Sequence, residues 1–113
     1  MHEVSLMENA LAIALDYAAR DGARRIDKLS LRVGPLAGVE PSALQFAFDI
    51  VTQDTLAAGA RLEIIDSPIR CYCSSCCREF TPLTLGYECP HCHTWSATVL
   101  QGQELELASL EVS

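Results

Sequence analysis

Two pairs of cysteines in the last third of the chain constrain its fold more than any other feature. The pairs are Cys73-Ser-Ser-Cys76 and Cys89-Pro-His-Cys92, and 12 residues (77–88) separate them. Two cysteines at this spacing form a knuckle that presents both sulfur atoms to one ion, and two knuckles complete a tetrahedral Zn²⁺ site. Because four thiolates leave no open coordination position, such a site is structural rather than catalytic. The sequence therefore predicts a small zinc-stapled module.

Three other uses of the cysteines compete with zinc. Six cysteines in 113 residues can form a disulfide scaffold, but the chain start has neither the basic nor the long apolar region of a secretory signal. The run Cys89-Pro-His-Cys92-His93 matches the CxxCH haem-attachment pattern, which needs an exported context and leaves the upstream pair without a function. A redox dithiol pair is the third alternative. Zinc is favoured over all three, with Cys71 and Cys77 as spare residues that are small and buried rather than reactive.

Charge and hydropathy limit the partners and the compartment. A net charge of −7 disfavours binding to a phosphate backbone, which takes clustered Lys and Arg, so we expect no nucleic-acid partner. Nothing approaches the roughly 18 consecutive apolar residues of a membrane span, so we expect no membrane association. The missing signal and the reduced thiols predict a cytoplasmic protein. The length suits one compact domain, or a small domain with a metal-stapled module.

Hydrophobic periodicity before the cysteines predicts helix, strand, helix, strand. Ser5 and Glu8 form a capping-box pattern, with Ser5 as the N-cap of a first helix that ends near residue 22. Residues 28–33 alternate apolar and polar and predict a half-buried strand. A second helix is expected from residue 40, with Pro at an early position, Leu44, Ala47, Phe48 and Val51 in its apolar stripe, and Phe46 and Ile50 widening that stripe. Residues 61–66 predict a second strand.

A third strand is expected over residues 105–112, at the end of the chain. Its apolar positions change phase near Ala108, as a β-bulge would cause. The middle strand–helix–strand unit favours a right-handed crossover between parallel strands. The expected fold is α/β, with two helices on a small three-stranded mixed sheet and an inserted four-cysteine zinc-ribbon-like module. The expected domains are an α/β domain of residues 1–69 plus 98–113 and a zinc-binding domain of residues 70–97.

The first three residues are a second candidate metal site. The Met1 α-amine, the His2 amide nitrogen and His2 Nδ1 can close a five- and a six-membered chelate ring on one ion, and Glu3 can add a fourth donor. Nitrogen donors held in a plane suit Ni²⁺ or Cu²⁺. A lone histidine near a chain start is, however, more often a frayed side chain without function than a ligand. The residues alone do not establish this site.

Three segments of the chain together resemble the HypA/HybF family, the nickel metallochaperones of [NiFe]-hydrogenase maturation. They are Met-His-Glu-Val-Ser-Leu at the start, Val33-Gly34 through Gly38-Val39-Glu40 in the middle, and the CxxC–x12–CPxC module. The resemblance covers essentially the whole length and keeps the order of the segments. It implies a small α/β nickel-binding domain with a four-cysteine zinc domain.

The resemblance also implies roles for particular residues. Ni(II), as a transient cargo, is expected at His2, with the Met1 amine and Glu3 alongside. Glu40 falls where some relatives place an acidic residue near nickel. Structural Zn(II) is expected at Cys73, Cys76, Cys89 and Cys92.

A function and a set of partners follow from the resemblance. The chain is expected to bind Ni(II) at its N-terminus and to help insert it into the [NiFe]-hydrogenase large subunit precursor, together with a HypB-type GTPase. A homodimer stays open. The alternative is a zinc-ribbon protein–protein adaptor without nickel transfer. No nucleophile–base set, phosphate loop or open three-ligand metal site is found, so the chain is expected not to be an enzyme and to have no catalytic residues.

Overall fold

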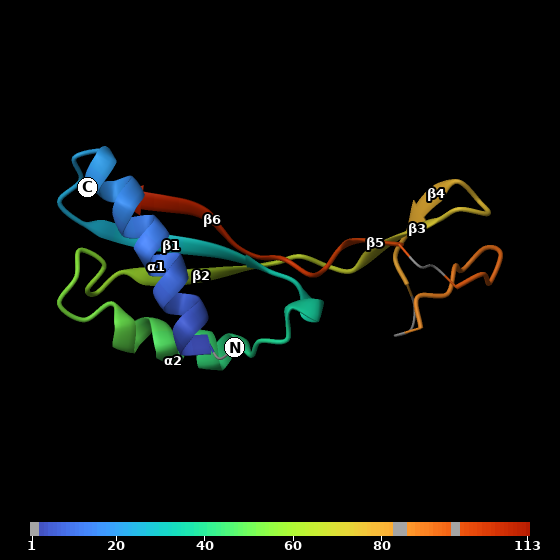
Figure 1. The fold of residues 1–113 in the computed structure, drawn as a ribbon, viewed down its shortest axis with the longest axis horizontal. Coiled ribbons are helices and arrows are strands. Elements are labelled where there is room, and N and C mark those ends of the chain that lie inside the picture. The colour runs from blue at the N-terminus through green and yellow to red at the C-terminus, as the bar shows by residue number, and fades with distance from the viewer. Residues whose placement is uncertain (1–2, 83–85, 96–97) are drawn as a thin grey trace. The chain divides into compact units, whose positions relative to one another are not determined.

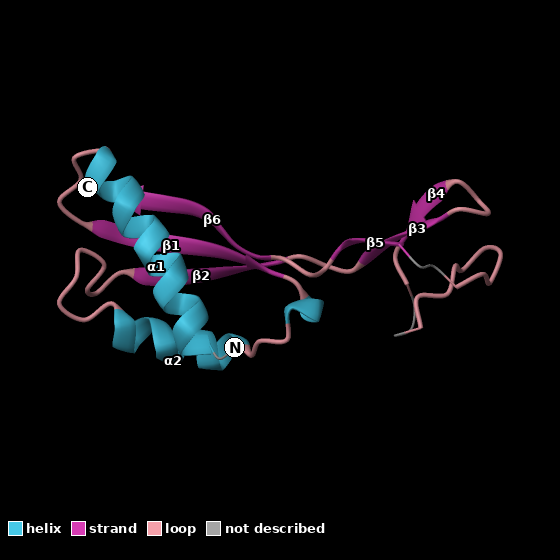
Figure 2. Cartoon of the chain, in the orientation of Figure 1, coloured by secondary structure: helices cyan, strands magenta, loops and turns pink. Residues whose placement is uncertain are grey.

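The computed structural model describes residues 3–82, 86–95 and 98–113. Figures 1 and 2 show its elements along the chain. In chain order they are α1 (Glu3–Arg20), β1 (Ile26–Val33), the 3-10 turn η1 (Pro35–Ala37), α2 (Pro41–Val51), β2 (Arg61–Asp66), β3 (Arg70–Cys73), β4 (Arg78–Phe80), β5 (Thr98–Gln101) and β6 (Leu105–Val112).

Internal contacts divide the chain into two compact units. The first unit comprises Met1–Arg32, Gly38–Ile65 and Leu105–Ser113, and the second comprises Val33–Ala37 and Asp66–Glu104. The segment 70–97 lies within the second unit. A domain division at residues 69/70 and 97/98 stays a prediction.

The first unit contains a three-stranded sheet in the order β2-β1-β6. Residue numbers run in opposite directions along β1 and β6, since Lys28 pairs with Glu111 and Arg32 pairs with Glu106. These two strands are therefore antiparallel.

Strands β1 and β2 run in the same direction. Ser30 Oγ donates to Glu63, and three residues later the Val33 carbonyl accepts from the Ser67 amide. The helix α2 makes the connection that parallel neighbours need. The expected mixed sheet with two helices is confirmed.

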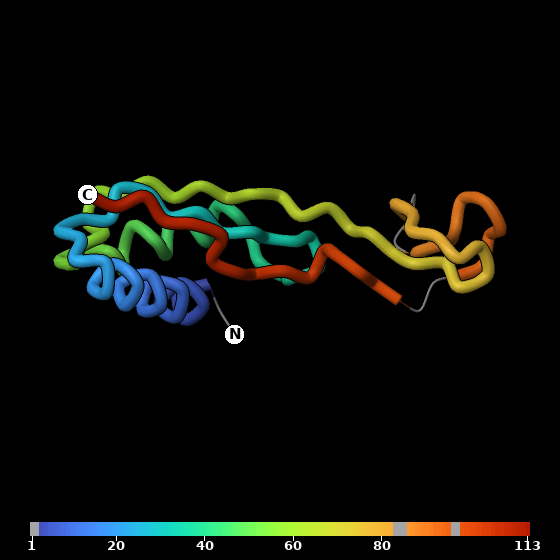
Figure 3. Tube along the Cα trace, turned by 90° about the horizontal axis from the view of Figure 1, so that it is seen from above, coloured from blue at the N-terminus to red at the C-terminus, as the bar shows by residue number. Residues whose placement is uncertain are grey.

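The core of the first unit lies between β1 and the two helices, and Figure 3 shows α1 along one side of the strands. The helix α1 packs against α2 and β6. Helical spacing brings one stripe of each helix onto β1, whose alternate residues face it. The buried side chains of this core include Met7, Leu11, Ala14, Ile26, Leu29, Leu31, Leu44 and Phe48.

Two details of the expected helices are wrong. The helix α1 begins at Glu3, so Ser5 lies inside its first turn and is not the N-cap. An acidic side chain in the first turn suits the helix dipole, and nothing in residues 3–5 breaks a helix. In α2, Phe46 and Ile50 are 69% and 46% exposed, because the face of this helix that points into the core is the one with Leu44, Ala47 and Phe48.

The second unit contains a second sheet, which the sequence did not predict. Strand β3 pairs antiparallel with both β4 and β5, in the order β4-β3-β5. These strands have three or four residues, too few for a clear alternation of apolar and polar positions. The sheet joins the first cysteine pair to the returning chain.

Among the residues that the structure describes, neither α1 nor α2 combines the length and the apolar character needed to cross a bilayer.

Two glycines in the second unit allow two backbones to approach closely. The Gly34 amide donates to Glu104 O at 2.8 Å, and the Leu36 amide donates to Gly102 O at 2.8 Å. A Cβ at Gly34 would collide with the Gly102 carbonyl. Gly34 is therefore required by the space available at this point.

We expect Gly34→Ala to lower the free energy of unfolding by about 1–3 kcal/mol, because a methyl group has to displace backbone atoms. Gly38→Ala is the matched control. A Cβ at Gly38 meets open space, although the alanine has to adopt a φ of +74°. The free energy of unfolding should therefore fall less than in Gly34→Ala. Urea unfolding of the zinc-loaded proteins measures both, and equal stability of Gly34→Ala and the parent would contradict the close approach.

Candidate metal centre

The two cysteine pairs meet at one point in the second unit. The sulfur atoms of Cys73, Cys76, Cys89 and Cys92 all lie within 4.8 Å of one another. The Cys73 and Cys92 sulfurs are 3.5 Å apart, and those of Cys76 and Cys89 are 4.0 Å apart. A tetrahedron with metal–sulfur bonds of about 2.3 Å has sulfur–sulfur edges of about 3.8 Å. The donor set and its dimensions therefore fit a tetrahedral ion such as Zn²⁺.

The first knuckle is the turn between β3 and β4. Strand β3 ends at Cys73, whose sulfur accepts a hydrogen bond from the Cys76 amide at 3.4 Å. Cys77 then adopts a positive φ of 54°, and Arg78 returns opposite Cys73 in the sheet. This amide-to-sulfur bond fixes the position of the Cys73 sulfur within the turn.

The second knuckle is built in a similar way. The His93 amide donates to Cys89 O at 2.9 Å, and the Cys89 amide donates to Thr94 O at 2.9 Å. His93 has a positive φ of 61°, so the residue after each CxxC pair adopts the left-handed conformation. An isolated β-bridge between Glu88 and Trp95 closes the loop. Each knuckle thus directs its sulfurs inward through local backbone bonds.

Sulfur makes up most of the core of the second unit. Its buried cluster consists of Cys71, Cys73, Phe80 and Cys89. Cys76 is half-buried and Cys92 is exposed, so the group of four sulfur atoms reaches the surface on one side. Ile69, Tyr87 and Val99 pack against this cluster but are only partly buried. The core of the described residues therefore gives little hydrophobic stabilisation, and a bound ion would supply what it lacks.

Hydrogen bonds at the cluster shift the pKa values of Cys92 and Cys76 in opposite directions. Hydrogen bonds from the side chain and backbone of Thr94 are the main cause that lowers the pKa of Cys92 to about 6. A hydrogen bond with Cys92, followed by burial, raises the pKa of Cys76 to about 12. Without a cation, one thiolate thus forms readily while its neighbour keeps its proton. A metal ion has to displace that proton, so metal affinity should rise with pH.

The two spare cysteines, Cys71 and Cys77, are not part of the group of four sulfur atoms. Cys71 is fully buried in β3, and burial raises the pKa of its thiol, which confirms the expectation for this residue. Cys77 is exposed, so the expectation that it is buried is wrong. Its left-handed position after the knuckle turns the side chain outward, where the thiol donates to Ser74 O at 3.5 Å.

The expected nickel residues are only partly within the described structure. Met1 and His2 lie outside the described residues. Glu3 is the first residue of α1. Glu40 is the exposed residue before α2, with an extended backbone and no hydrogen bond from its side chain to the helix start.

One contributor to the cysteine site was missed. Thr94 hydrogen-bonds Cys92 through its side chain and its backbone. A hydroxyl residue two positions after a knuckle is the only sequence signal for this role, and the cysteine spacing does not reveal it.

We expect Cys76→Ser or Cys89→Ser to lose stoichiometric zinc and to disorder roughly residues 70–97, because the ion substitutes for a core. The first unit should keep its helices, since its buried residues lie outside this segment. Metal analysis, limited proteolysis and the helical circular-dichroism signal test this. A zinc-free variant with an unchanged, protease-resistant module would contradict it.

Cys77→Ser is the matched control for the choice of ligands. It removes an adjacent thiol that lies outside the four-sulfur cluster. Zinc should stay at about one ion per chain. A zinc content well below that value would show that Cys77 is a ligand.

Comparisons with known proteins identify the family. A family model described as "Hydrogenase/urease nickel incorporation, metallochaperone, hypA" matches residues 1–112. A hydrogenase maturation factor HypA from Picosynechococcus sp. is 49% identical over 112 residues, covering 99% of both chains. Another from Alkalilimnicola ehrlichii is 42% identical over 112 residues, also covering 99% of both chains.

Two solved structures are similar to this one. The solution structure of the Ni metallochaperone HypA from Helicobacter pylori has a TM-score of 0.69 and 28% identity, covering 99% of this chain and 97% of that chain. A second solution structure of a HypA protein has a TM-score of 0.77 and 28% identity, covering 100% and 97%. With its whole-chain match, its mixed sheet with two helices and its four clustered cysteines, this chain belongs to the HypA family of nickel-incorporation metallochaperones for hydrogenases.

Proposed function

We propose that this protein binds Ni(II) at its N-terminus and helps insert it into the [NiFe]-hydrogenase large subunit during maturation. The family match over residues 1–112 carries the proposal, because it includes the residues with nitrogen donors. The ligands proposed are the Met1 amine, the His2 amide nitrogen and His2 Nδ1, with Glu3 as the fourth. A HypB-type GTPase and the large subunit precursor are the partners proposed.

The start of α1 supports this ligand set. The first four amide groups of a helix have no acceptor within the helix. Since α1 begins at Glu3, a metal can use the Glu3 amide without breaking a helical hydrogen bond. The Glu3 carboxylate lies in the same first turn.

The position of Glu40 fits a supporting role. Leu6 and Leu44 line one cavity in the first unit, and each lies about one turn after Glu3 and Glu40, respectively. The starts of α1 and α2 are therefore neighbours. The exposed Glu40 carboxylate adds negative charge at the end where the proposed cation binds.

The two proposed metal sites have different roles. We propose that Cys73, Cys76, Cys89 and Cys92 hold structural Zn(II), with a complete coordination shell that does not exchange its ion easily. The N-terminal donors are few and accessible, as transfer of a cargo ion requires. No step of the proposed transfer uses the zinc ion as a reactant.

We expect His2→Ala to abolish specific Ni(II) binding while zinc content and fold stay unchanged. The substitution removes the imidazole and opens the six-membered chelate ring. His91→Ala is the matched control, since His91 is exposed and belongs to the other unit. Isothermal titration with Ni(II) measures both. Binding should weaken as pH falls, because a protonated imidazole cannot coordinate.

A one-residue N-terminal extension tests the amine separately, because it keeps His2 but displaces the amine from the chelate. Nickel binding should weaken strongly. In a nickel-limited cell, His2→Ala protein should accumulate but fail to support hydrogenase activity, with partial rescue by added nickel. Normal hydrogenase maturation by His2→Ala would instead favour a zinc-ribbon adaptor without nickel transfer.

A further inference from the structure

Strand β6 carries large apolar side chains that the first unit covers only in part. Its apolar residues Leu105, Leu107, Leu110 and Val112 are all half-buried, and none is fully buried. In contrast, β1 buries Ile26, Leu29, Leu31 and Val33. Two helices are enough to cover the centre of this sheet but not its β6 edge.

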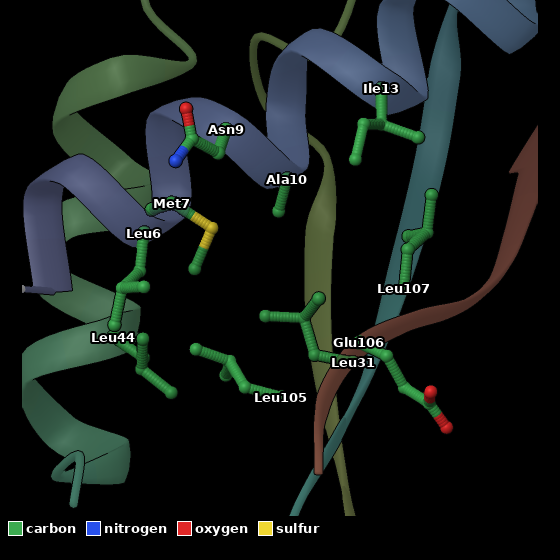
Figure 4. A pocket seen from close by; sticks show the side chains of 10 residues that line it. All are labelled: Leu6, Met7, Asn9, Ala10, Ile13, Leu31, Leu44, Leu105, Glu106 and Leu107. Carbon is green, nitrogen blue, oxygen red and sulfur yellow. The ribbon is translucent and has the colours of Figure 1, made fainter. Parts of the chain in front are cut away.

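A groove runs between α1 and β6, and we call it the α1–β6 groove. One part is a cavity of about 430 Å³, lined by Ala10 and Ile13 on α1 and by Leu105 and Leu107 on β6, among others. Figure 4 shows Leu105 and Leu107 pointing toward α1, while Glu106 points away. A separate cavity of about 180 Å³ lies further along the same two elements, with Tyr17 of α1 and Leu110 of β6 in its lining. Ile13 and Tyr17 are 51% and 56% exposed.

The groove borders an open sheet edge. In the sheet of the described residues, β6 has β1 as its one neighbour. Ser113 exchanges two hydrogen bonds with Arg25, and Glu104 accepts one from Gly34. Because successive residues of a strand point their backbone groups to opposite sides, Val112 and Leu105 present theirs to the open edge. An incoming strand finds both backbone partners and an apolar groove for alternate side chains.

The charge of this edge is acidic. Strand β6 contains Glu106 and Glu111 and no basic residue. Glu106 pairs with Arg32 at 2.8 Å, but Glu111 shares Lys28 with Glu63, each at 3.3 Å. The glutamate side chains remain 53% and 62% exposed. They can therefore form ion pairs with Lys or Arg side chains of a strand placed alongside.

A second copy of the chain fits this edge poorly. Antiparallel pairing of β6 with itself at full overlap places Glu106 opposite Glu111 twice, and parallel pairing in register places each glutamate opposite its copy. Like charges directly opposite destabilise a pair of strands. Each chain also carries a net charge of −7.

We propose that the open edge of β6 and the α1–β6 groove bind an extended segment of a partner protein in which apolar and basic residues alternate. Its apolar side chains enter the groove beside Ile13 and Leu107, and its Lys or Arg side chains pair with Glu106 and Glu111. The site is independent of the metal ligands and goes beyond the proposed nickel transfer.

A labelled eight-residue peptide of alternating valine and lysine is the probe, titrated against the full zinc-loaded chain by fluorescence anisotropy. We expect saturable binding below about 1 mM, with amide NMR shifts concentrated in residues 105–112. The binding should weaken as salt rises. A peptide of alternating valine and glutamate should bind at least about tenfold more weakly, because its charges meet Glu106 and Glu111.

Three variants test the parts of the site. Ile13→Asn should weaken binding about fivefold by removing apolar contact, while Ile50→Asn, an exposed isoleucine on α2, should not. Val112→Pro should weaken it about fivefold or more, because it removes an amide that faces the open edge and leaves the bonds of Ser113 to Arg25. Glu111→Gln should reduce the salt dependence, while Asp49→Asn should not.

Four results would overturn the proposal. They are no saturable binding, equal binding of the two peptides, equal effects of Ile13→Asn and Ile50→Asn, and NMR shifts outside β6 and α1. Concentration-dependent self-association of the chain that Val112→Pro abolishes would also overturn it, because a second copy would then occupy the edge. Circular dichroism of each variant confirms that the fold is kept.

Discussion

The fold of the second unit depends on four sulfur atoms that lie within 4.8 Å of one another. Four thiolates at this separation repel strongly, and four thiols provide only weak hydrogen bonds. A divalent cation would turn the repulsion into coordination. Hydrogen bonds from Thr94 lower the pKa of Cys92, and a hydrogen bond with Cys92 raises that of Cys76. Among the described residues, Phe80 is the one large apolar side chain buried in this cluster, so we expect the short strands β3, β4 and β5 to depend on a bound ion for their stability.

The same constraint separates structural from exchangeable metal binding. A complete set of four sulfur ligands, two of them buried, resists the approach of an acceptor. A carrier needs the opposite arrangement, with few ligands at an accessible point. The start of α1 provides amide groups that have no acceptor within the helix, and it provides the acidic side chain of Glu3. Placing the proposed cargo site in the first unit and the closed site in the second keeps the two ions from competing for ligands.

Local patterns predicted most of the fold, and the failures have local causes. The cysteine spacing identified the cluster because a knuckle is formed by adjacent backbone bonds, such as that from Cys76 to Cys73. The prediction that Ser5 is the N-cap was wrong, because Glu3, Val4 and Ser5 can all adopt the helical conformation at little cost in free energy. The exposure of Phe46 and Cys77 depends on how much surface their neighbours cover, which periodicity does not report. The strands of the second unit were too short to predict. The N-terminal donors suggested a metal site, but only the family resemblance assigned the proposed nickel ion to them.

The size of the first unit explains why its surface is uneven. A domain this small has too little secondary structure to cover its whole sheet. The apolar residues of the central strand β1 are therefore buried, while those of the edge strand β6 are only half-buried. An open strand with exposed apolar residues invites uncontrolled pairing. Glu106 and Glu111 oppose self-pairing through like charges, and the same two carboxylates attract a basic strand. One feature of β6 therefore both protects the free chain and selects the proposed partner.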